Sequence, residues 1–129
     1  MKKISSKLLS YVAASHEDPD SPGAVKKVLF TSSDFRNKVK LQMINWARIG
    51  KGNSFVAHHH EDMDEVFVII SGKVMIYIND KTEILEKGDA VLVPMRSTHR
   101  MINIGASDVD YIVIGLSLGK DGKTIIDSP

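Results

Sequence analysis

The 129-residue sequence contains no cysteine. It therefore has no disulfide, no thiolate nucleophile and no sulfur ligand for a metal, in keeping with a reducing cytoplasm. It also lacks a hydrophobic run long enough to cross a bilayer. Seventeen basic and sixteen acidic residues leave a net charge of +1, so no charge excess points to nucleic acid or to an anionic membrane. We expect a cytoplasmic protein whose partner is a small molecule.

The composition is typical of one folded domain. Hydrophobic residues make up 43% and charged residues 26% of the chain, which is too apolar for a disordered protein. The length is sufficient to bury a core without cross-links. We divide the sequence into an N-terminal extension and linker at residues 1–24, a main domain at residues 25–118 and a C-terminal tail at residues 119–129.

The N-terminal extension has two parts. Residues 4–14 match a signal peptide poorly, because serine and lysine residues interrupt the apolar segment. We expect a short helix or an irregular strap there, packed on the domain or on a second subunit. Residues 15–24 contain two prolines, a glycine and three acids, which predicts a loop. His16 is alone in this loop and is expected to be solvated.

From Ala24 onward, short runs rich in valine and isoleucine alternate with turn residues. This spacing is typical of β-strands, and no segment demands a helix. Turns at residues 71–73 and 79–81 indicate hairpins. The pattern predicts an all-β, antiparallel jelly-roll-like barrel or a sandwich. The expected strands are residues 25–31, 39–49, 55–60, 65–71, 74–79, 82–86, 90–93, 99–104 and 111–118.

Several of these strands are apolar on both faces, among them residues 66–70, 74–78 and 111–114. The outward face of such a strand needs a cover, which a second sheet, the N-terminal strap or a second subunit provides. A homodimer is the commonest of these arrangements. We therefore expect a homodimer, with coverage by the chain itself as the alternative.

Residues 52–65 contain three of the five histidines and four carboxylates. Side chains alternate along a strand, so His58 and His60 point to one face and His59 to the other. Only the first two can share a metal ion. We expect His59 to face outward or toward the second sheet.

Two later residues complete a set of ligands. Glu65 begins the next strand on a face that continues through apolar residues, where a carboxylate is costly without a charged partner. His99 begins a strand further along the chain and supplies a third imidazole. Three imidazoles and one carboxylate suit one divalent transition-metal ion, iron, manganese, zinc, nickel or copper, better than calcium or magnesium.

Two motifs resemble those of a known family. The first is Gly52-x5-His58-x-His60-x4-Glu65-x6-Gly72, and the second is Gly88-x5-Pro94-x-Arg96-x2-His99-x3-Asn103. They are similar to the two motifs of the cupin superfamily, with Arg96 standing where the family usually has glycine. The resemblance covers roughly residues 36–118 and implies a small jelly-roll-like β-barrel, often dimeric. It also implies that His58, His60, Glu65 and His99 are the metal ligands.

The resemblance leaves the reaction open. Cupins include dioxygenases, decarboxylases, isomerases and epimerases, and some members only bind or sense ligands. We expect either a metal-dependent oxygenase or isomerase acting on an oxygen-rich metabolite, or a non-catalytic metal- or metabolite-binding module. No separate general base is evident, since no further histidine is expected to face inward. The residues expected near a substrate are Phe67, Arg96, Met101 and Asn103. Of these, Arg96 would hold an anionic group.

Overall fold

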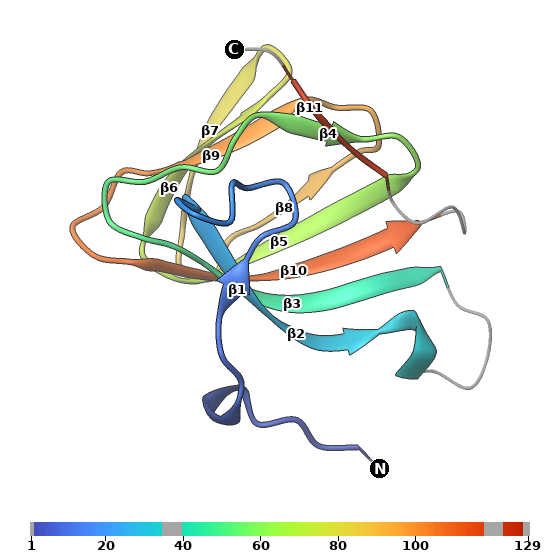
Figure 1. Ribbon diagram of the computed structural model, residues 1–129. Helices are drawn as coiled ribbons and strands as arrows, with labels where there is room; N and C mark the ends of the chain where they lie inside the picture. The colour runs from blue at the N-terminus through green and yellow to red at the C-terminus, as the bar shows by residue number, and fades with distance from the viewer. Residues whose placement is uncertain (1, 35–39, 118–122, 128–129) are drawn as a thin grey trace.

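The computed structural model describes residues 2–34, 40–117 and 123–127. Within these ranges the chain forms β-strands and two short 3-10 helices, η1 (Ser6–Leu8) and η2 (Ser32–Asp34). The strands form two antiparallel sheets that face each other (Figure 1). The prediction of an all-β, antiparallel fold is confirmed. Neither of the helices in the described ranges is long and apolar enough to cross a membrane.

The two sheets differ in size. The larger sheet has six strands in the order β1-β2-β3-β10-β5-β8, and the smaller has five in the order β11-β4-β9-β6-β7. The six strands are β1 (Val12–Ala13), β2 (Ala24–Thr31), β3 (Leu41–Ile49), β10 (Val109–Ser117), β5 (Met63–Ser71) and β8 (Ala90–Val93). The five strands are β11 (Thr124–Ile126), β4 (His58–His60), β9 (His99–Asn103), β6 (Lys73–Ile78) and β7 (Lys81–Glu86).

Nine strands lie where the sequence predicts them, and their ends differ by a few residues. Strand β4 is shorter than expected, because the residues before it meet β9 only at isolated points: Ser54 forms a single bridge with Ile102, and the Phe55 N–H donates to Met101 O. Strand β5 begins earlier, at Met63, where it still pairs with Ser117. The predicted strand residues 39 and 118 lie outside the described residues.

Both chain ends contribute strands that the sequence analysis does not predict. In β1, Ala13 pairs with Val25 of β2, and the next residue, Ala14, is buried in the core. Leu8 and Val12 are 87% and 53% exposed, so these two side chains do not pack on the domain, and their packing on a second subunit stays a prediction. The segment is held through its backbone and through the ring of Tyr11, which lies against Lys27 and Arg48. At the other end, β11 pairs with β4 and lies beside the histidines of that strand.

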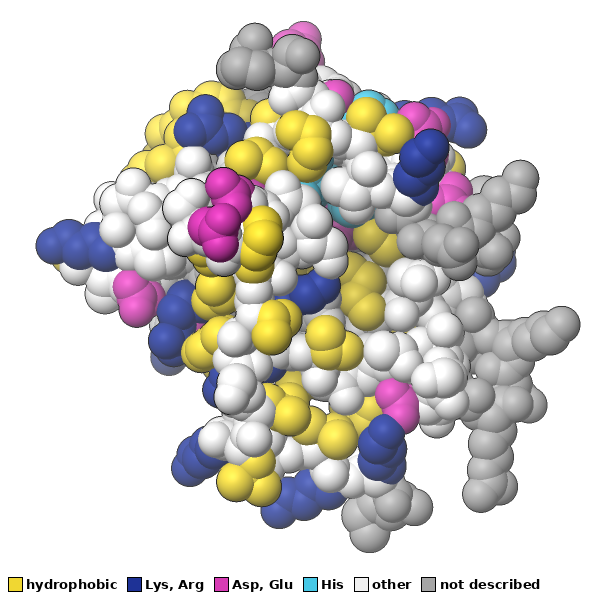
Figure 2. Space-filling view, in the orientation of Figure 1, with side chains coloured by type: hydrophobic (Ala, Val, Ile, Leu, Met, Phe, Trp, Pro, Cys, Tyr) yellow, Lys and Arg dark blue, Asp and Glu magenta, His cyan; other side chains and the backbone are white. Residues whose placement is uncertain are grey.

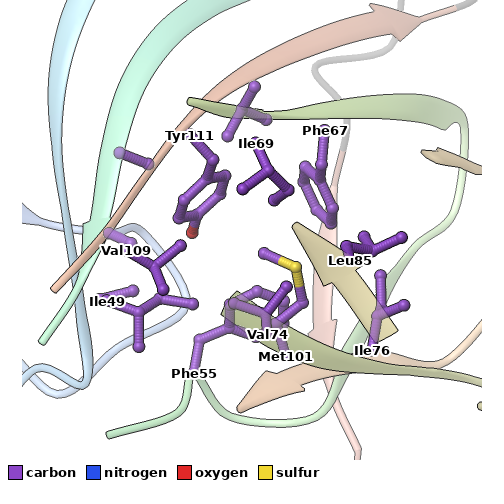
Figure 3. Close-up of a cluster of buried hydrophobic side chains, with 14 of the residues drawn as sticks. Ile49, Phe55, Phe67, Ile69, Val74, Ile76, Leu85, Met101, Val109 and Tyr111 are labelled. Carbon is purple, nitrogen blue, oxygen red and sulfur yellow. The ribbon is translucent and has the colours of Figure 1, made fainter. Parts of the chain in front are cut away.

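The hydrophobic core fills the space between the sheets. Burial alternates along β5 and β10, whose every second residue points inward. The core side chains come from both sheets (Figure 3): Ile49, Phe55, Phe67, Ile69, Val74, Ile76, Leu85, Met101, Val109 and Tyr111. On the outer faces Ile84 is 50% and Leu92 58% exposed. The homodimer stays a prediction.

Two glycines with the same backbone conformation allow a matched test of the turns. Gly72 and Gly88 both have φ of +91°, which is strained for any residue with a side chain. A Cβ at Gly72 would lie 2.6 Å from Val109 Cγ2, whereas one at Gly88 would have nothing within 4 Å. Changing Gly88 to alanine should therefore lower the free energy of unfolding by about 1–2 kcal/mol through backbone strain alone.

The same change at Gly72 adds a clash with the β10 backbone and should cost roughly a further 1–3 kcal/mol. Urea unfolding of both variants measures the difference directly. Equal losses in Gly72→Ala and Gly88→Ala would show that the close approach of the 71–73 turn to β10 is absent.

Candidate metal centre

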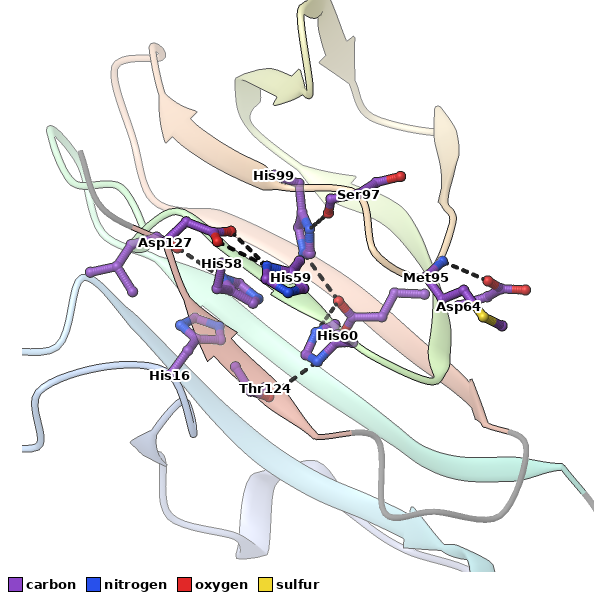
Figure 4. A network of polar contacts seen from close by, with 12 residues as sticks. His16, His58, His59, His60, Asp64, Met95, Ser97, His99, Thr124 and Asp127 are labelled. Carbon is purple, nitrogen blue, oxygen red and sulfur yellow. Dashed lines mark hydrogen bonds and ion pairs between the residues drawn. The ribbon is translucent and has the colours of Figure 1, made fainter.

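Four buried polar side chains from three strands meet between the sheets (Figure 4). His58 and His60 come from β4 and His99 from β9, whereas Glu65 comes from β5 in the opposite sheet. One ligand atom from each residue lies within 4.8 Å of those of the other three. None of the four residues is more than 6% exposed. The structure thus brings together the four residues that the sequence selects as ligands.

Each imidazole is oriented by a partner on its Nδ1 side. Nδ1 of His58 donates to Val56 O at 2.8 Å, and Nδ1 of His99 donates to Ser97 O at 2.9 Å. Nδ1 of His60 lies 3.1 Å from the Thr124 hydroxyl. A backbone carbonyl can only accept, so the neutral rings of His58 and His99 carry their proton on Nδ1. This tautomer leaves Nε2 as the metal-binding nitrogen.

The contacts of Glu65 are suited to a cation. Its Oε1 lies 2.8 Å from Nε2 of His60 and 3.2 Å from Nε2 of His99. Because His99 already donates its Nδ1 proton to Ser97, its Nε2 lone pair faces a carboxylate oxygen. The two atoms can stay this close only if a proton or a metal ion lies between them. Metal–nitrogen bonds of about 2.1 Å place neighbouring ligand atoms roughly 3 Å apart, so the residues fit a transition-metal ion.

Burial and charge oppose each other in this group. Burial by itself would raise the pKa of Glu65, but the contacts with His60 and His99 outweigh it and lower that pKa. The carboxylate is therefore ionised at neutral pH. Burial, together with the nearby His16 and His99 rings, lowers the pKa of His58 to about 2. His58 is therefore neutral, the form in which imidazole binds metals.

His16 overturns two expectations from the sequence. Its side chain is only 14% exposed, and its ring stacks on His58 with centroids 4.0 Å apart. The residue lines the same cavity as the four-residue cluster, so the predictions that it is solvated and that no further histidine faces inward are both wrong. The loop composition gave no hint, because the direction of a loop side chain depends on how the loop packs.

Glu17 holds this loop against the site. Its Oε1 accepts from the Gly23 N–H at 2.9 Å, and its Oε2 accepts from the Val56 N–H at 3.0 Å. The same Oε2 lies 2.8 Å from His16 Nδ1. Because the Val56 carbonyl in turn accepts from His58, one carboxylate links the N-terminal loop to the orientation of a predicted ligand.

A cavity of about 410 Å³ opens beside the cluster. His58, His60 and Glu65 form one end of it. In Figure 2, cyan histidine atoms lie recessed between yellow hydrophobic side chains on the upper half of the molecule. Phe67, expected near a substrate, lines the cavity. Further lining residues that the sequence analysis does not select are His16, Lys26, Asn45 and Tyr111.

The other three residues expected near a substrate lie elsewhere. Met101 is fully buried in the hydrophobic core. Asn103 organises the turn after β9, where its Nδ2 donates to Ser107 O at 2.8 Å and its Oδ1 accepts from the Gly105 N–H at 2.9 Å. Arg96 is exposed, and among the described residues none of these three lines the cavity.

Arg96 is the residue at which the second motif departs from the family pattern, and its backbone conformation is the one that a glycine would adopt there. Its φ of +64° is in the left-handed region that favours glycine, so the turn keeps the glycine-like conformation with an arginine in place. Its N–H donates to the carbonyl of His60 at 2.7 Å. The backbone of Arg96 therefore supports β4, although its exposed side chain does not line the cavity.

His59 points away from the cluster, as expected from strand alternation. Its Nδ1 lies 2.9 Å from Asp127 Oδ1, and its Nε2 lies 3.3 Å from Glu61 Oε1. The contact with Asp127 contributes most to raising the pKa of His59. This histidine joins the C-terminal segment to β4 and takes no part in the four-residue group.

The family-model match identifies the class of protein. Residues 45–115, just over half of the chain, match the model for the cupin domain. The chain therefore belongs to the cupin family. It is 41% identical over 44 residues to the uncharacterized protein YdbB of Bacillus subtilis, a match that covers 33% of this chain and 39% of that relative.

Solved structures show the same fold at low identity. A predicted oxalate decarboxylase from Thermotoga maritima superposes with a TM-score of 0.79 at 19% identity, over 91% of this chain and all of that one. The polyketide cyclase RemF from Streptomyces resistomycificus also gives 0.79 at 14% identity, over all of this chain and 87% of that one. The fold is thus shared by proteins with different reactions.

The depressed pKa of His58 predicts a loss of stability in acid. In the unfolded chain this histidine binds a proton below pH 6.5, whereas in the folded protein it stays neutral. Its contribution to the free energy of unfolding is therefore complete above that pH and decreases as the pH falls. Between pH 7 and pH 5 the chelator-treated protein should lose about 2 kcal/mol of unfolding free energy through His58. The pKa of His59 is raised by its partly exposed pair with Asp127. This pair therefore adds to the free energy of unfolding as the pH falls, opposite to the effect of His58.

Urea titrations of the wild type and of His58→Asn at both pH values isolate this effect. The variant should show a correspondingly smaller loss on acidification. The same loss in both proteins would contradict a buried, neutral His58.

Proposed function

We propose that this cupin binds one divalent transition-metal ion through His58, His60, Glu65 and His99. The observation that supports it most strongly is the convergence of four buried ligand atoms, one from each residue, within 4.8 Å of one another. The mixed nitrogen and oxygen ligands favour iron, manganese, zinc, nickel or copper over calcium and magnesium. The Nδ1 partners of the three rings hold the ligands in place.

The cavity beside this site would hold a small, oxygen-rich molecule. A bound ion supplies Lewis-acid or redox chemistry at the end of the cavity. Phe55 and Phe67 form apolar walls there and limit the access of water. Burial raises the pKa of Tyr111, which keeps its phenol protonated and able to donate a hydrogen bond into the cavity.

Two functions agree with this arrangement. In the first, the protein is a metal-dependent oxygenase or isomerase that acts on this molecule. In the second, it binds or senses a metal-bound metabolite without turnover. Oxygen uptake by the iron-loaded protein with diketones or hydroxy acids, compared with the zinc-loaded protein, distinguishes an oxygenase from a non-catalytic binder, and conversion of the added compound without oxygen uptake identifies an isomerase.

We also propose that the protein is a cytoplasmic homodimer. The lack of cysteine supports the location. The exposed Ile84 and Leu92 are apolar surface that a second subunit would cover. Light scattering coupled to gel filtration measures the mass in solution, and a mass near 14.3 kDa would contradict the dimer.

Two histidines on β4 provide a matched test of metal binding. His60 faces the four-residue group, whereas His59 faces away from it. Replacing His60 with alanine should weaken zinc or manganese binding about 100-fold or more, because a ligand is lost. His59→Ala should bind within a few-fold of the wild type. Isothermal titration calorimetry on protein purified without nickel columns measures both affinities.

The proposal fails if neither metal binds the wild type, or if His60→Ala binds as tightly as the wild type. Equal weakening by both substitutions would instead place the metal elsewhere on β4.

A further inference from the structure

The outer face of the six-stranded sheet is apolar across five strands. On β2, β3, β10, β5 and β8, the side chains that alternate with the core residues point away from the smaller sheet. Strand pairing aligns ten of them in two rows. The first row is Phe30, Ile44, Ile114, Val66 and Leu92, and the second is Lys27, Trp46, Ile112, Val68 and Ala90. Nine of the ten are apolar and none is buried, so the rows form a continuous hydrophobic surface.

The size of this outer face matches that of a stable protein interface. Neighbouring strands lie about 4.8 Å apart, and a strand rises about 3.3 Å per residue. Five strands and the nine residues of β10 therefore span roughly 24 Å by 30 Å, or about 700 Å². A stable interface buries about 800 Å² on each partner. The apolar rows and their surroundings thus provide about the area that a second copy of the chain needs.

Polar side chains lie beyond both rows. On one side Arg48 Nε pairs with Asp110 Oδ1 at 2.7 Å, and on the other Asp64 lies opposite Leu116. An apolar centre with aromatic residues and a polar rim is the usual composition of a protein interface, and homodimer interfaces have the most apolar centres. A sheet face can also pack on its own copy about a two-fold axis, which buries the same rows on both subunits.

The N-terminal strap neutralises the one charged position of the rows. Lys27 Nζ donates to Ser6 O at 2.7 Å and lies 4.4 Å from the centroid of the Tyr11 ring. The lysine therefore already has partners at the edge of the face. Between these two strap residues, Leu8 is 87% exposed, and the strap extends away from the two sheets (Figure 1). A second copy packed on the outer face would give this leucine an apolar surface to contact.

We propose that the outer face of the six-stranded sheet binds a second copy of the chain, so that two such sheets pack face to face with β10 at the centre. This inference rests on the homodimer proposed above and assigns its interface. Of the two exposed residues named there, Leu92 belongs to this face, whereas Ile84 lies on the smaller sheet. The metal ligands lie on the inner side of the sheets, so both sites of the dimer stay separate from the interface.

Lysine substitutions on the two sheets provide a matched test. Ile112 lies on the central strand of the face, and Ile84 is 50% exposed on the outer side of the smaller sheet. By light scattering, the wild type should have twice the 14.3 kDa mass of one chain. Ile112→Lys should raise the dissociation constant of the dimer about 100-fold or more, because it buries two like charges near the two-fold axis. Ile84→Lys should stay a dimer.

Trp46 is the only tryptophan in the chain and reports on the same face. Its quenching by acrylamide should increase when the wild type is diluted below the dissociation constant of the dimer. Ile112→Lys should match the diluted wild type at every concentration. Circular dichroism and thermal unfolding show whether each lysine variant is folded, and Leu92→Lys on the edge strand β8 replaces Ile112→Lys if lysine is not tolerated on β10.

A wild type that keeps the mass of one chain throughout the dilution series overturns the homodimer and this interface together. A wild-type dimer that persists in Ile112→Lys and Leu92→Lys overturns only the assignment of the face, and dissociation by Ile84→Lys would place the interface on the smaller sheet. Zinc affinity should be the same in Ile112→Lys and the wild type, so the metal proposal is tested independently of the dimer.

Discussion

The buried carboxylate of Glu65 is the constraint on which the site depends. An anion that is 5% exposed between two sheets must be neutralised, and the groups that contact it are the imidazoles of His60 and His99. Because His58 and His99 donate their Nδ1 protons to backbone carbonyls, their neutral rings cannot also donate to Glu65. A proton, or the metal ion that we propose, would resolve the conflict by lying between His99 and Glu65, and it would join β9 of one sheet to β5 of the other.

Much of this arrangement could be predicted from the sequence, because it depends on local periodicity. Alternation along a strand places His58 and His60 together and turns His59 away, and the structure agrees. Turn residues at regular spacing predict the hairpins and hence the two-sheet fold. Glu65 could be selected as a ligand from the sequence, because a charged residue at the start of an apolar strand face needs a charged partner.

The residues that were missed depend on contacts between distant segments. His16 lies in a loop whose composition says nothing about its direction, yet the loop folds back on His58. Lys26 and Asn45 share the cavity only because β2 pairs with β3. Two consecutive lysines in a predicted strand were a usable signal, since one of them must face inward. For Arg96 the motif spacing predicted the turn but not the direction of the side chain, which is exposed.

The four-residue cluster and the cavity beside it are built from strands of both sheets. The shared cation itself can be tested by nitrogen-15 NMR of the imidazole rings during zinc addition to chelator-treated protein. We expect large shifts at Nε2 of His58, His60 and His99, with the Nδ1 protons of His58 and His99 retained and His59 unchanged. An unchanged Nε2 of His99, or a shift of His59 together with the others, would contradict a metal ion shared with Glu65.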